Sequence, residues 1–212
     1  MRYCAISPDG QTIAFSYQGD IYTVPSSGGK ARQLTTHPAH DTRPVWSPDG
    51  QKIAFASNRS GNFDVFLMNK EGGEPKRLTY EYPTTFKDNG HILYLANILQ
   101  DAKDIQFPGT RFMQVYEIST DGGRPDLYSS LYMENIALSK DGSKLLYNDY
   151  KGYEDPWRKH HQSSITRDIW LCTLGKDRSF QKVTTFGGED RNPVWAADGA
   201  SFYYLSEEKG SF

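Results

Sequence analysis

The sequence predicts an all-β fold, namely a β-propeller of four-stranded antiparallel blades that is incomplete, with about four and a half blades in this chain. Three observations support this prediction. A strand–turn–strand signature recurs five times, a third strand follows it in four copies, and in most of these a fourth strand comes next. The composition agrees, because 14% aromatic residues, 19 Gly and 11 Pro suit many short strands joined by tight turns.

The clearest copy of the signature is Ser47-Pro48-Asp49-Gly50, followed by Ile53-Ala54-Phe55. Proline presets φ at the second turn position, aspartate bonds to its own backbone, and glycine adopts a conformation that other residues avoid. The first two intervals between turn glycines are 50 − 10 = 40 and 90 − 50 = 40 residues, and later ones are 142 − 90 = 52 and 199 − 142 = 57. Four antiparallel strands in about 40 residues make one propeller blade. The turn glycines are Gly10, Gly50, Gly90, Gly142 and Gly199.

The remaining strands of each blade follow in order. The expected third strands are residues 20–24, 64–68, 114–118 and 168–172, and the clearest fourth strands are 32–35, 77–79 and 182–184. The blades are therefore expected at residues 3–41, 42–83, 84–130 and 131–190, with a half blade at 191–212, all in a single domain. Small or apolar residues between the core positions predict that both faces of each sheet are packed. They are Ala14, Ala54, Tyr94, Leu146 and Tyr203.

Charge and hydropathy exclude several classes of protein. A net charge of −2 argues against nucleic acid as a partner, because a phosphate backbone needs a basic surface. No apolar run reaches the ~20 residues of a membrane-spanning helix. We expect a cytoplasmic protein, or a periplasmic or secreted one if a signal peptide has been removed. Cys4 and Cys172 are expected to be buried free thiols, since the pair shows neither metal-ligand spacing nor a disulfide framework.

The repeats resemble a known family. Copies of Trp-Ser-Pro-Asp-Gly followed by an Asp-Ile-Tyr strand and an Arg-x-Leu-Thr strand are similar to the WD40-like Pro-Asp repeats of TolB and tricorn-type propellers. The strings Glu154–His161 and Thr166–Trp170 resemble more narrowly the amino-terminal propeller of tricorn-like serine peptidases. The resemblance implies a non-catalytic propeller module that docks peptides or filters their admission. The alternative that it leaves open is a TolB-like propeller of the cell envelope that binds a protein partner.

The later copies depart from the pattern. The third, fourth and fifth copies have lost the turn proline, and the fifth also stops before its third strand. Because the family forms closed rings, we interpret the chain as a fragment of a larger protein, whose missing domains would be natural partners. Open blade edges would also favour self-association.

Sequence motifs for catalysis are absent. The chain has no Gly-x-Ser-x-Gly, His-Glu-x-x-His, phosphate-binding Gly-Lys-Ser/Thr or Cys-x-x-Cys string. In tricorn-like peptidases the catalytic residues belong to a later domain, so the resemblance assigns no catalytic residue here. We therefore expect no metal and no cofactor. An enzyme with its active site in the propeller channel is a third reading, which would need an inward cluster of carboxylates or a metal.

Topology predicts where binding residues gather. The short turns, including Ser-Pro-Asp-Gly, lie on one face, and the irregular loops lie on the other. On that second face, Arg43 and Arg191, with Asp41 and Asp190 beside them, are expected to form a charged collar that grips a peptide carboxylate. The alternative is that each arginine pairs with an acid and ties neighbouring blades together.

Two long inserts and one loop add further candidates on the second face. Trp157, Arg158, Lys159, His160 and His161 offer an aromatic plate, cations and a pH-sensitive pair, or else form a hairpin that packs on the next blade. Joint chelation of one metal by the two histidines is not expected, because neighbours in a strand point to opposite faces. His40 and Arg167 complete the predicted peptide or partner site, although a hydrogen-bonded turn role is the alternative for His40.

Overall fold

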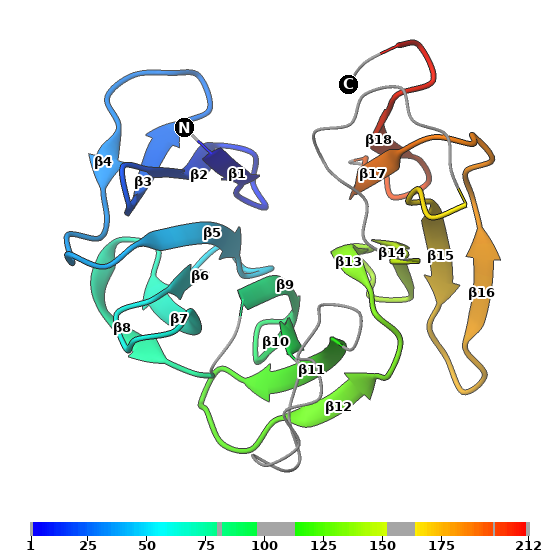
Figure 1. Cartoon of the computed structure of the whole chain (residues 1–212). Coiled ribbons are helices and arrows are strands. Elements are labelled where there is room, and N and C mark those ends of the chain that lie inside the picture. Colours follow the sequence, from blue (N-terminus) through cyan, green and yellow to red (C-terminus); the bar gives the residue numbers. More distant parts are fainter. Residues whose placement is uncertain (1, 80–81, 97–112, 152–163, 197, 211–212) are drawn as a thin grey trace. The chain divides into compact units, whose positions relative to one another are not determined.

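The computed structural model describes residues 2–79, 82–96, 113–151, 164–196 and 198–210. These residues form antiparallel β-sheets and contain no helix (Figure 1). In particular, the described part of the chain has no helix that is long and apolar enough to span a membrane. The all-β prediction is therefore confirmed.

The first compact unit comprises Met1–Ala96 and Val115–Tyr128. It contains three four-stranded meanders, which pack with β1 against β5 and β5 against β9. The strands are β1 (Arg2–Ile6), β2 (Thr12–Tyr17), β3 (Asp20–Pro25), β4 (Arg32–Gln33), β5 (Asp41–Trp46), β6 (Lys52–Ser57), β7 (Asp64–Asn69), β8 (Gly72–Arg77), β9 (Tyr82–Asp88), β10 (His91–Ala96), β11 (Gln114–Ser119) and β12 (Asp126–Ser129).

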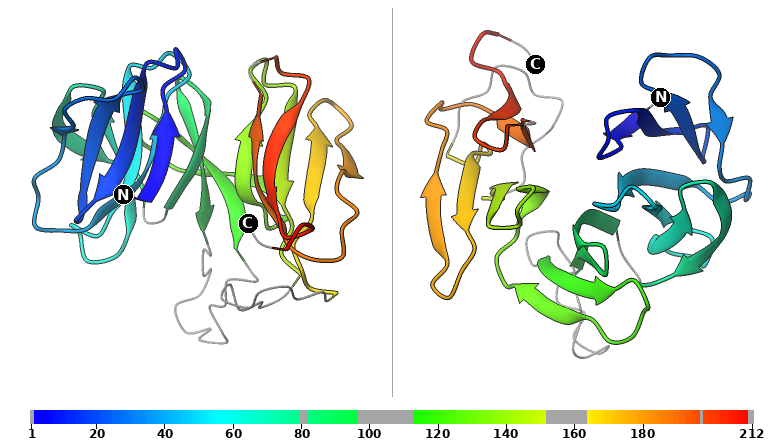
Figure 2. Two further views of the ribbon diagram at one scale, coloured as in Figure 1. Left: turned by 90° about the horizontal axis from the view of Figure 1, so that it is seen from above. Right: turned by 180° about the vertical axis from the view of Figure 1, so that it is seen from behind.

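The second compact unit includes Ser129–Phe212. It contains one four-stranded meander and a two-stranded sheet, with β13 packed against β17. The strands are β13 (Glu134–Leu138), β14 (Lys144–Asn148), β15 (Ile169–Thr173), β16 (Ser179–Lys182), β17 (Asp190–Trp195) and β18 (Phe202–Ser206). In Figure 2 the strands of each unit stand side by side, and their turns gather at two opposite ends.

The Ser-Pro-Asp-Gly turns form as predicted. The amide of Gly10 donates to the carbonyl of Ser7 at 2.8 Å, and Gly10 has φ = 72°, which an L side chain rarely adopts. The Asp9 carboxylate accepts from the Ser7 hydroxyl at 2.5 Å and from the Gln11 amide at 3.0 Å. In the fourth copy, hydrogen bonds from the hydroxyls of Ser139 and Ser143 lower the pKa of Asp141 to about 2. The motif therefore satisfies its own polar groups.

The third copy, which lacks the turn proline, makes a different turn. Asp88 pairs directly with His91, so only Asn89 and Gly90 form the loop. The Asn89 side chain instead accepts from the amide of Asp49 at 2.9 Å, which links the turns of two neighbouring sheets. Loss of the proline alone does not explain the change, because the fourth copy also lacks it and keeps the usual turn, with the amide of Gly142 donating to the carbonyl of Ser139 at 2.9 Å.

The core lies between successive sheets. In the first unit, Phe55 and Phe66 pack with Ala14 and Ile21 of the first sheet. On the opposite face of the same strands, Ala54, Val65 and Leu67 pack with residues of β9, β10 and β11. Both faces of the β5–β8 sheet are therefore buried, as blade-on-blade packing requires.

The equivalent apolar position is not buried in every copy. Ala14, Ala54 and Leu146 are 0% exposed and Tyr94 is 2% exposed, but Tyr203 on β18 is 73% exposed. The expectation for Tyr203 is wrong because, among the residues that the structure describes, no other sheet of the second unit covers that face of β17–β18. The prediction for Cys4 is also wrong: Cys172 is buried, but Cys4 is exposed. Among the described residues of the first unit, only the second sheet packs against the first sheet, through β5, so the first sheet is covered on one side only.

Trp46 and Trp195 tie neighbouring sheets together. The indole N–H of Trp46 donates to the carbonyl of Ala5 at 3.1 Å, and that of Trp195 donates to the carbonyl of Ala137 at 2.9 Å. In both cases the acceptor lies on the innermost strand of the preceding sheet. These tryptophans are structural, as their repetition in register predicts.

Candidate functional site

The loops of each unit separate onto two faces. At one end, the amide of Ser26 donates to the carbonyl of Gln11 at 2.8 Å, so the β3–β4 turn lies beside the β1–β2 turn. At the other end, the amide of Asp41 donates to the carbonyl of Gly19 at 2.7 Å, so the link between sheets lies beside the β2–β3 turn. We call the first end the turn face and the second the loop face. The division of loops predicted from topology holds within each unit.

Asp41, a predicted member of the collar, is completely buried. One guanidinium nitrogen of Arg59 contacts both of its carboxylate oxygens, at 2.8 and 3.1 Å. Arg59 Nε also donates to Ser57 Oγ at 3.0 Å, and the guanidinium lies 4.8 Å from the ring centre of Phe66. Asp41 therefore joins the start of β5 to the β6–β7 loop of its own sheet and does not pair with Arg43.

Arg43 lies at a bulge in β5, where it has φ = 52°. Tyr3 occupies the equivalent bulge in β1, with φ = 53°, and the Arg43 guanidinium lies 4.9 Å from the centre of its ring. A bulge re-aims the side chain of its strand, and here two bulges bring a cation onto an aromatic ring. Arg43 thus bridges two sheets while its side chain remains exposed.

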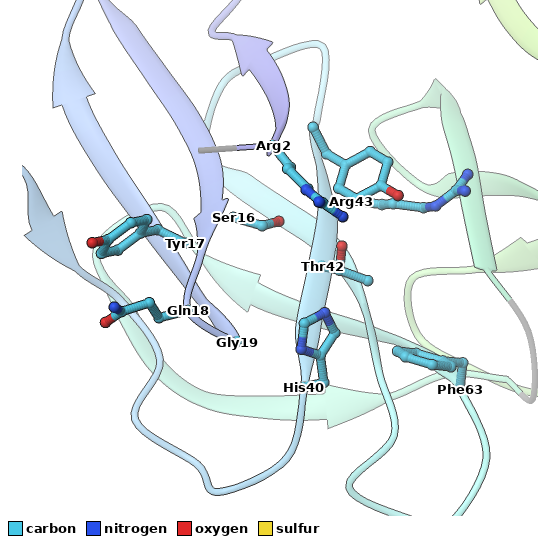
Figure 3. A pocket seen from close by; sticks show the side chains of 10 residues that line it. Arg2, Ser16, Tyr17, Gln18, Gly19, His40, Thr42, Arg43 and Phe63 are labelled. Atoms are coloured by element: carbon cyan, nitrogen blue, oxygen red, sulfur yellow. The ribbon is translucent and has the colours of Figure 1, made fainter. Parts of the chain in front are cut away.

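A pocket of about 500 Å³ opens on the loop face between the first two sheets (Figure 3). Its walls come from β1, the end of β2 with the β2–β3 turn, the start of β5 and the β6–β7 loop. Among the described residues that line it there is no carboxylate. The lining residues are Arg2, Tyr3, Ser16, Tyr17, Gln18, Gly19, His40, Thr42, Arg43 and Phe63.

Two buried hydroxyls line this pocket. Ser16 is 7% exposed and Thr42 is 5% exposed, and the hydroxyl of each lacks a hydrogen-bond partner among the described residues. Buried hydroxyls are normally paired, so two unpaired ones in one pocket require an explanation. The β2–β3 turn beside them has positive φ at Gln18 and Gly19, which bends the chain sharply around the rim.

His40, which was predicted as a binding residue, forms part of the pocket wall. Its backbone amide donates to Asn58 Oδ1 at 2.7 Å, and its ring meets Phe63 edge to face, with ring centres 6.2 Å apart. These contacts fix the side chain as one wall of the pocket. The predicted residues His40 and Arg43 are thus brought together, and sequence reasoning missed Arg2, Ser16, Thr42 and Phe63.

Arg167 lies in a separate ionic cluster within the second unit. Its Nε donates to Glu134 Oε2 at 2.9 Å, and one Nη lies 3.5 Å from Glu189 Oε1. Burial opposes the charge, but the two carboxylates outweigh it and raise the pKa of Arg167. Tyr132 donates to the other oxygen of Glu134 at 2.6 Å, and burial together with that carboxylate raises the pKa of Tyr132. Arg167 therefore ties loops together.

Arg191 is not in register with Arg43. Asn192 occupies the position in the bulge of β17 that Arg43 occupies in the bulge of β5. Arg191 is instead equivalent to Thr42, because Arg191 pairs with Leu205 on the next strand as Thr42 pairs with Ala56. Arg191 Nε lies 3.7 Å from Glu189 Oε2. The two arginines thus occupy different environments in different units. Within the described residues, each has an acid or an aromatic ring beside it.

Asp190 occupies the position of Asp41, but Glu208 stands where Arg59 stands in the second sheet. Asp190 is 1% exposed, and burial raises its pKa, with Asp168 and Glu208 adding to the rise and the hydroxyls of Ser206 and Thr184 opposing it. An acid with a raised pKa in the folded state makes the fold less stable as pH rises from its unfolded pKa through the folded one.

We therefore expect Asp190→Asn to raise the melting temperature at pH 7 by about 2–4 °C, which corresponds to about 1 kcal/mol for a chain of this size. The gain should vanish at about pH 3, where the carboxyl is protonated in both the folded and the unfolded states. Thermal unfolding followed by circular dichroism at the two pH values measures this. A variant that is less stable than the wild type at pH 7 would show that the ionised carboxylate contributes stability.

The predicted residues Trp157, Arg158, Lys159, His160 and His161 lie outside the described residues, and their role stays a prediction. Among the residues that the structure describes, no group of three or more His, Cys, Asp or Glu side chains is placed to hold a metal ion. The pocket between the first two sheets is therefore the candidate site that the geometry supports best.

Comparison with known proteins places this geometry in a wider context. The family model of the tricorn protease N-terminal beta propeller domain matches residues 1–212. Tricorn protease homolog 1 of Streptomyces coelicolor is 25% identical over 212 residues, which cover 96% of this chain and 19% of that protein. The Saccharolobus solfataricus tricorn protease homolog is 23% identical over 99% of this chain and 19% of its own length. The chain thus spans about a fifth of these relatives.

Solved structures share the fold. The crystal structure of the tricorn protease matches with a TM-score of 0.73 at 20% identity, over 98% of this chain and 20% of that one. TolB from Acinetobacter baumannii matches with a TM-score of 0.62 at 18% identity, over 93% of this chain and 46% of that one. At these identities the likeness concerns the fold alone.

Proposed function

The chain belongs to the family of tricorn protease N-terminal β-propeller domains, and from this membership we propose that it is a non-catalytic propeller module of a tricorn-like peptidase. In this proposal the module docks peptides, or filters their admission, for a catalytic domain elsewhere in the protein. The family match and the resemblance of the repeats support the proposal that the parent protein is a tricorn-like peptidase. The pocket on the loop face supports the docking role.

The observation that carries the proposal is the basic lining of that pocket, in which none of the described residues has a carboxylate. Arg2 and Arg43 supply two guanidinium groups, and His40 and Phe63 supply an aromatic wall. Ligand sites combine apolar walls with a few convergent polar groups, and loops on a rigid β scaffold are where such sites usually form. An extended peptide that ends in a carboxylate presents the complementary charge and an apolar side chain.

The experiment is to measure binding and cleavage with the same purified chain. Fluorescent peptides of four to eight residues should bind, as followed by anisotropy, and should be recovered intact by mass spectrometry. Cleavage that scales with the concentration of the chain, and that a point mutation in the chain abolishes, would contradict the non-catalytic role. Failure of every peptide to bind would contradict docking.

The alternative is a TolB-like interaction propeller whose loop face receives a protein partner. The structural similarity to TolB from Acinetobacter baumannii supports it. The size of the native protein distinguishes the two proposals. A product about five times the length of this chain, as in the curated relatives, favours the peptidase module. A product of propeller size alone favours the TolB-like role.

Self-association through β17–β18 is a further proposal. Val194 is 59% exposed, Tyr203 73% and Leu205 46%, so this sheet presents an apolar surface of the kind that other chains cover. We expect size-exclusion chromatography with light scattering to show dimers or larger species at micromolar concentration, and Tyr203→Lys to shift them towards monomer. A clean monomer of the wild-type chain would contradict this proposal.

A further inference from the structure

We propose that copies of this chain associate head to tail, so that the β17–β18 sheet of one copy packs on the β1–β4 sheet of the next. This inference rests on the self-association proposed above and adds which surface of the second copy is taken. A second copy fits because the described residues leave uncovered both kinds of face that meet wherever two sheets of this chain pack together.

The junction between the first two sheets shows what such an interface contains. Phe55 and Trp46 of the second sheet pack in one cluster with Ala14 and Ile21 of the first sheet. The indole of Trp46 also donates to the carbonyl of Ala5 on β1 at 3.1 Å. We call the face that carries Trp46 and Phe55 the leading face of a sheet, and the face that carries Ala5 and Ala14 the trailing face. Each trailing face therefore receives the leading face of the next sheet.

The leading face of the first sheet has no such neighbour among the described residues of its unit. Ile6 stands four residues before its turn glycine, as Trp46 does, and is 62% exposed. Tyr17 lies on the same face and is 47% exposed. The ring of Tyr22 contacts those of Phe15 and Tyr17, with ring centres 5.7 and 6.0 Å apart. This face is therefore a continuous apolar and aromatic surface.

The trailing face of the β17–β18 sheet is open as well. Tyr203 stands where the first sheet has Ala14, pairs with Val194 on β17, and lies on the same side of β18 as Leu205. These three side chains are among the exposed large apolar residues of the chain. The other face carries Trp195, whose indole donates to β13, so the leading face of this sheet is already covered.

The sizes of the side chains on the two open faces favour their pairing. Ile6 is smaller than Trp46, its counterpart on the second sheet. Tyr203 is larger than Ala14 and Leu146, its counterparts on the first and fourth sheets. A small leading residue opposite a large trailing one fills the same space with the sizes exchanged, as close packing requires.

The alternative is a tail-to-tail dimer, in which two copies join through β17–β18 alone. It would place Tyr203 of each copy against a second trailing face. Within each unit, the junctions that the described residues form join a trailing face to a leading face. A head-to-tail junction repeats that arrangement, whereas a tail-to-tail junction does not. A head-to-tail contact also leaves one open face at each end of the pair, so further copies add until a ring closes.

Two lysine variants of the 212-residue chain test the proposal by light scattering after size exclusion, with a reducing agent because the thiol of Cys4 is exposed. Ile6→Lys and Tyr203→Lys should each weaken association at least about tenfold, since an unpaired ammonium group is costly to bury. Both positions are exposed, so the melting temperatures should stay near that of the wild type. Phe180→Lys is the matched control, because it places a lysine at an exposed apolar position outside both faces, and it should associate as the wild type does.

Mixing the two lysine variants separates the two arrangements. Ile6→Lys keeps its trailing face and Tyr203→Lys keeps its leading face, so an equimolar mixture should form a heterodimer and no larger species. If Ile6→Lys instead associates as the wild type does while Tyr203→Lys is monomeric, the head-to-tail arrangement is overturned and self-association through β17–β18 still stands. A wild-type chain that stays monomeric would overturn both, and would leave the peptide-docking function untouched.

Discussion

Replacing Asp41 by alanine is expected to lower the free energy of unfolding by about 3–5 kcal/mol. The Asp41 carboxylate is 0% exposed, and its partner Arg59 is 14% exposed and stacked on Phe66. Removing one member of such a pair leaves the other as a buried charge without its counterion. Urea or guanidinium unfolding, followed by tryptophan fluorescence, measures the difference.

The control for this prediction is Arg32→Ala, which breaks an ion pair whose side chains are 58% and 66% exposed. Exposed pairs contribute about 0–1 kcal/mol, so this variant should remain close to the wild type. A loss below 1 kcal/mol for Asp41→Ala would show that the pair contributes no more than a surface pair. If Asp41→Ala loses this much stability, any weaker peptide binding by an Asp41 variant reflects loss of the folded state and not loss of a contact with the peptide.

Replacing Phe55 by alanine is expected to lower the free energy of unfolding by about 3–5 kcal/mol. Its ring is 0% exposed and stacks on Phe66, with ring centres 6.0 Å apart, in the core between the first two sheets. The substitution removes the buried ring and leaves a cavity that strands held by ladders on both sides cannot collapse to fill. Denaturant unfolding at a fixed pH measures the loss.

Phe180→Ala is the matched control, because Phe180 on β16 is 41% exposed. Its loss should be well below that of Phe55→Ala, since surface substitutions usually stay within ±0.5 kcal/mol. Similar losses at both positions would contradict the view that the sheet-to-sheet core carries the stability of the first unit.

Much of the fold could be predicted because its information is local and repeated. The Ser-Pro-Asp-Gly turn fixes two strands and their register through contacts within six residues, from Ser7 to Thr12 in the first copy. The fourth strands were placed less well. The hydroxyl oxygens of Thr35 and Thr184 accept hydrogen bonds from backbone amides of the third strands. Because these contacts use side chains, the sequence pattern continues past the residues whose backbones form the fourth strand.

Less of the candidate site could be predicted, because its residues meet only through packing of one sheet on the next. Arg43 and His40 were expected on the loop face, but Arg2, Ser16 and Phe63 belong to other segments. Nothing local connects Arg59 to Asp41, which lies 18 residues away. Counting back from the turn glycines shows that Arg43 and Arg191 are one position apart (50 − 43 = 7 and 199 − 191 = 8), but it does not reveal that β5 and β17 bulge there.

Peptides are expected to bind on the loop face, between the first two sheets, and not at the turns that identify the repeat. Amide chemical-shift mapping of the ¹⁵N-labelled chain during titration with N-acetyl-Ala-Ala-Phe tests it most directly. The amide shifts should concentrate at Gly19, His40 and Thr42, while those of Gly10 and Gly50 on the turn face stay unchanged. Shifts concentrated at Gly10 and Gly50, with Gly19, His40 and Thr42 unchanged, would contradict it.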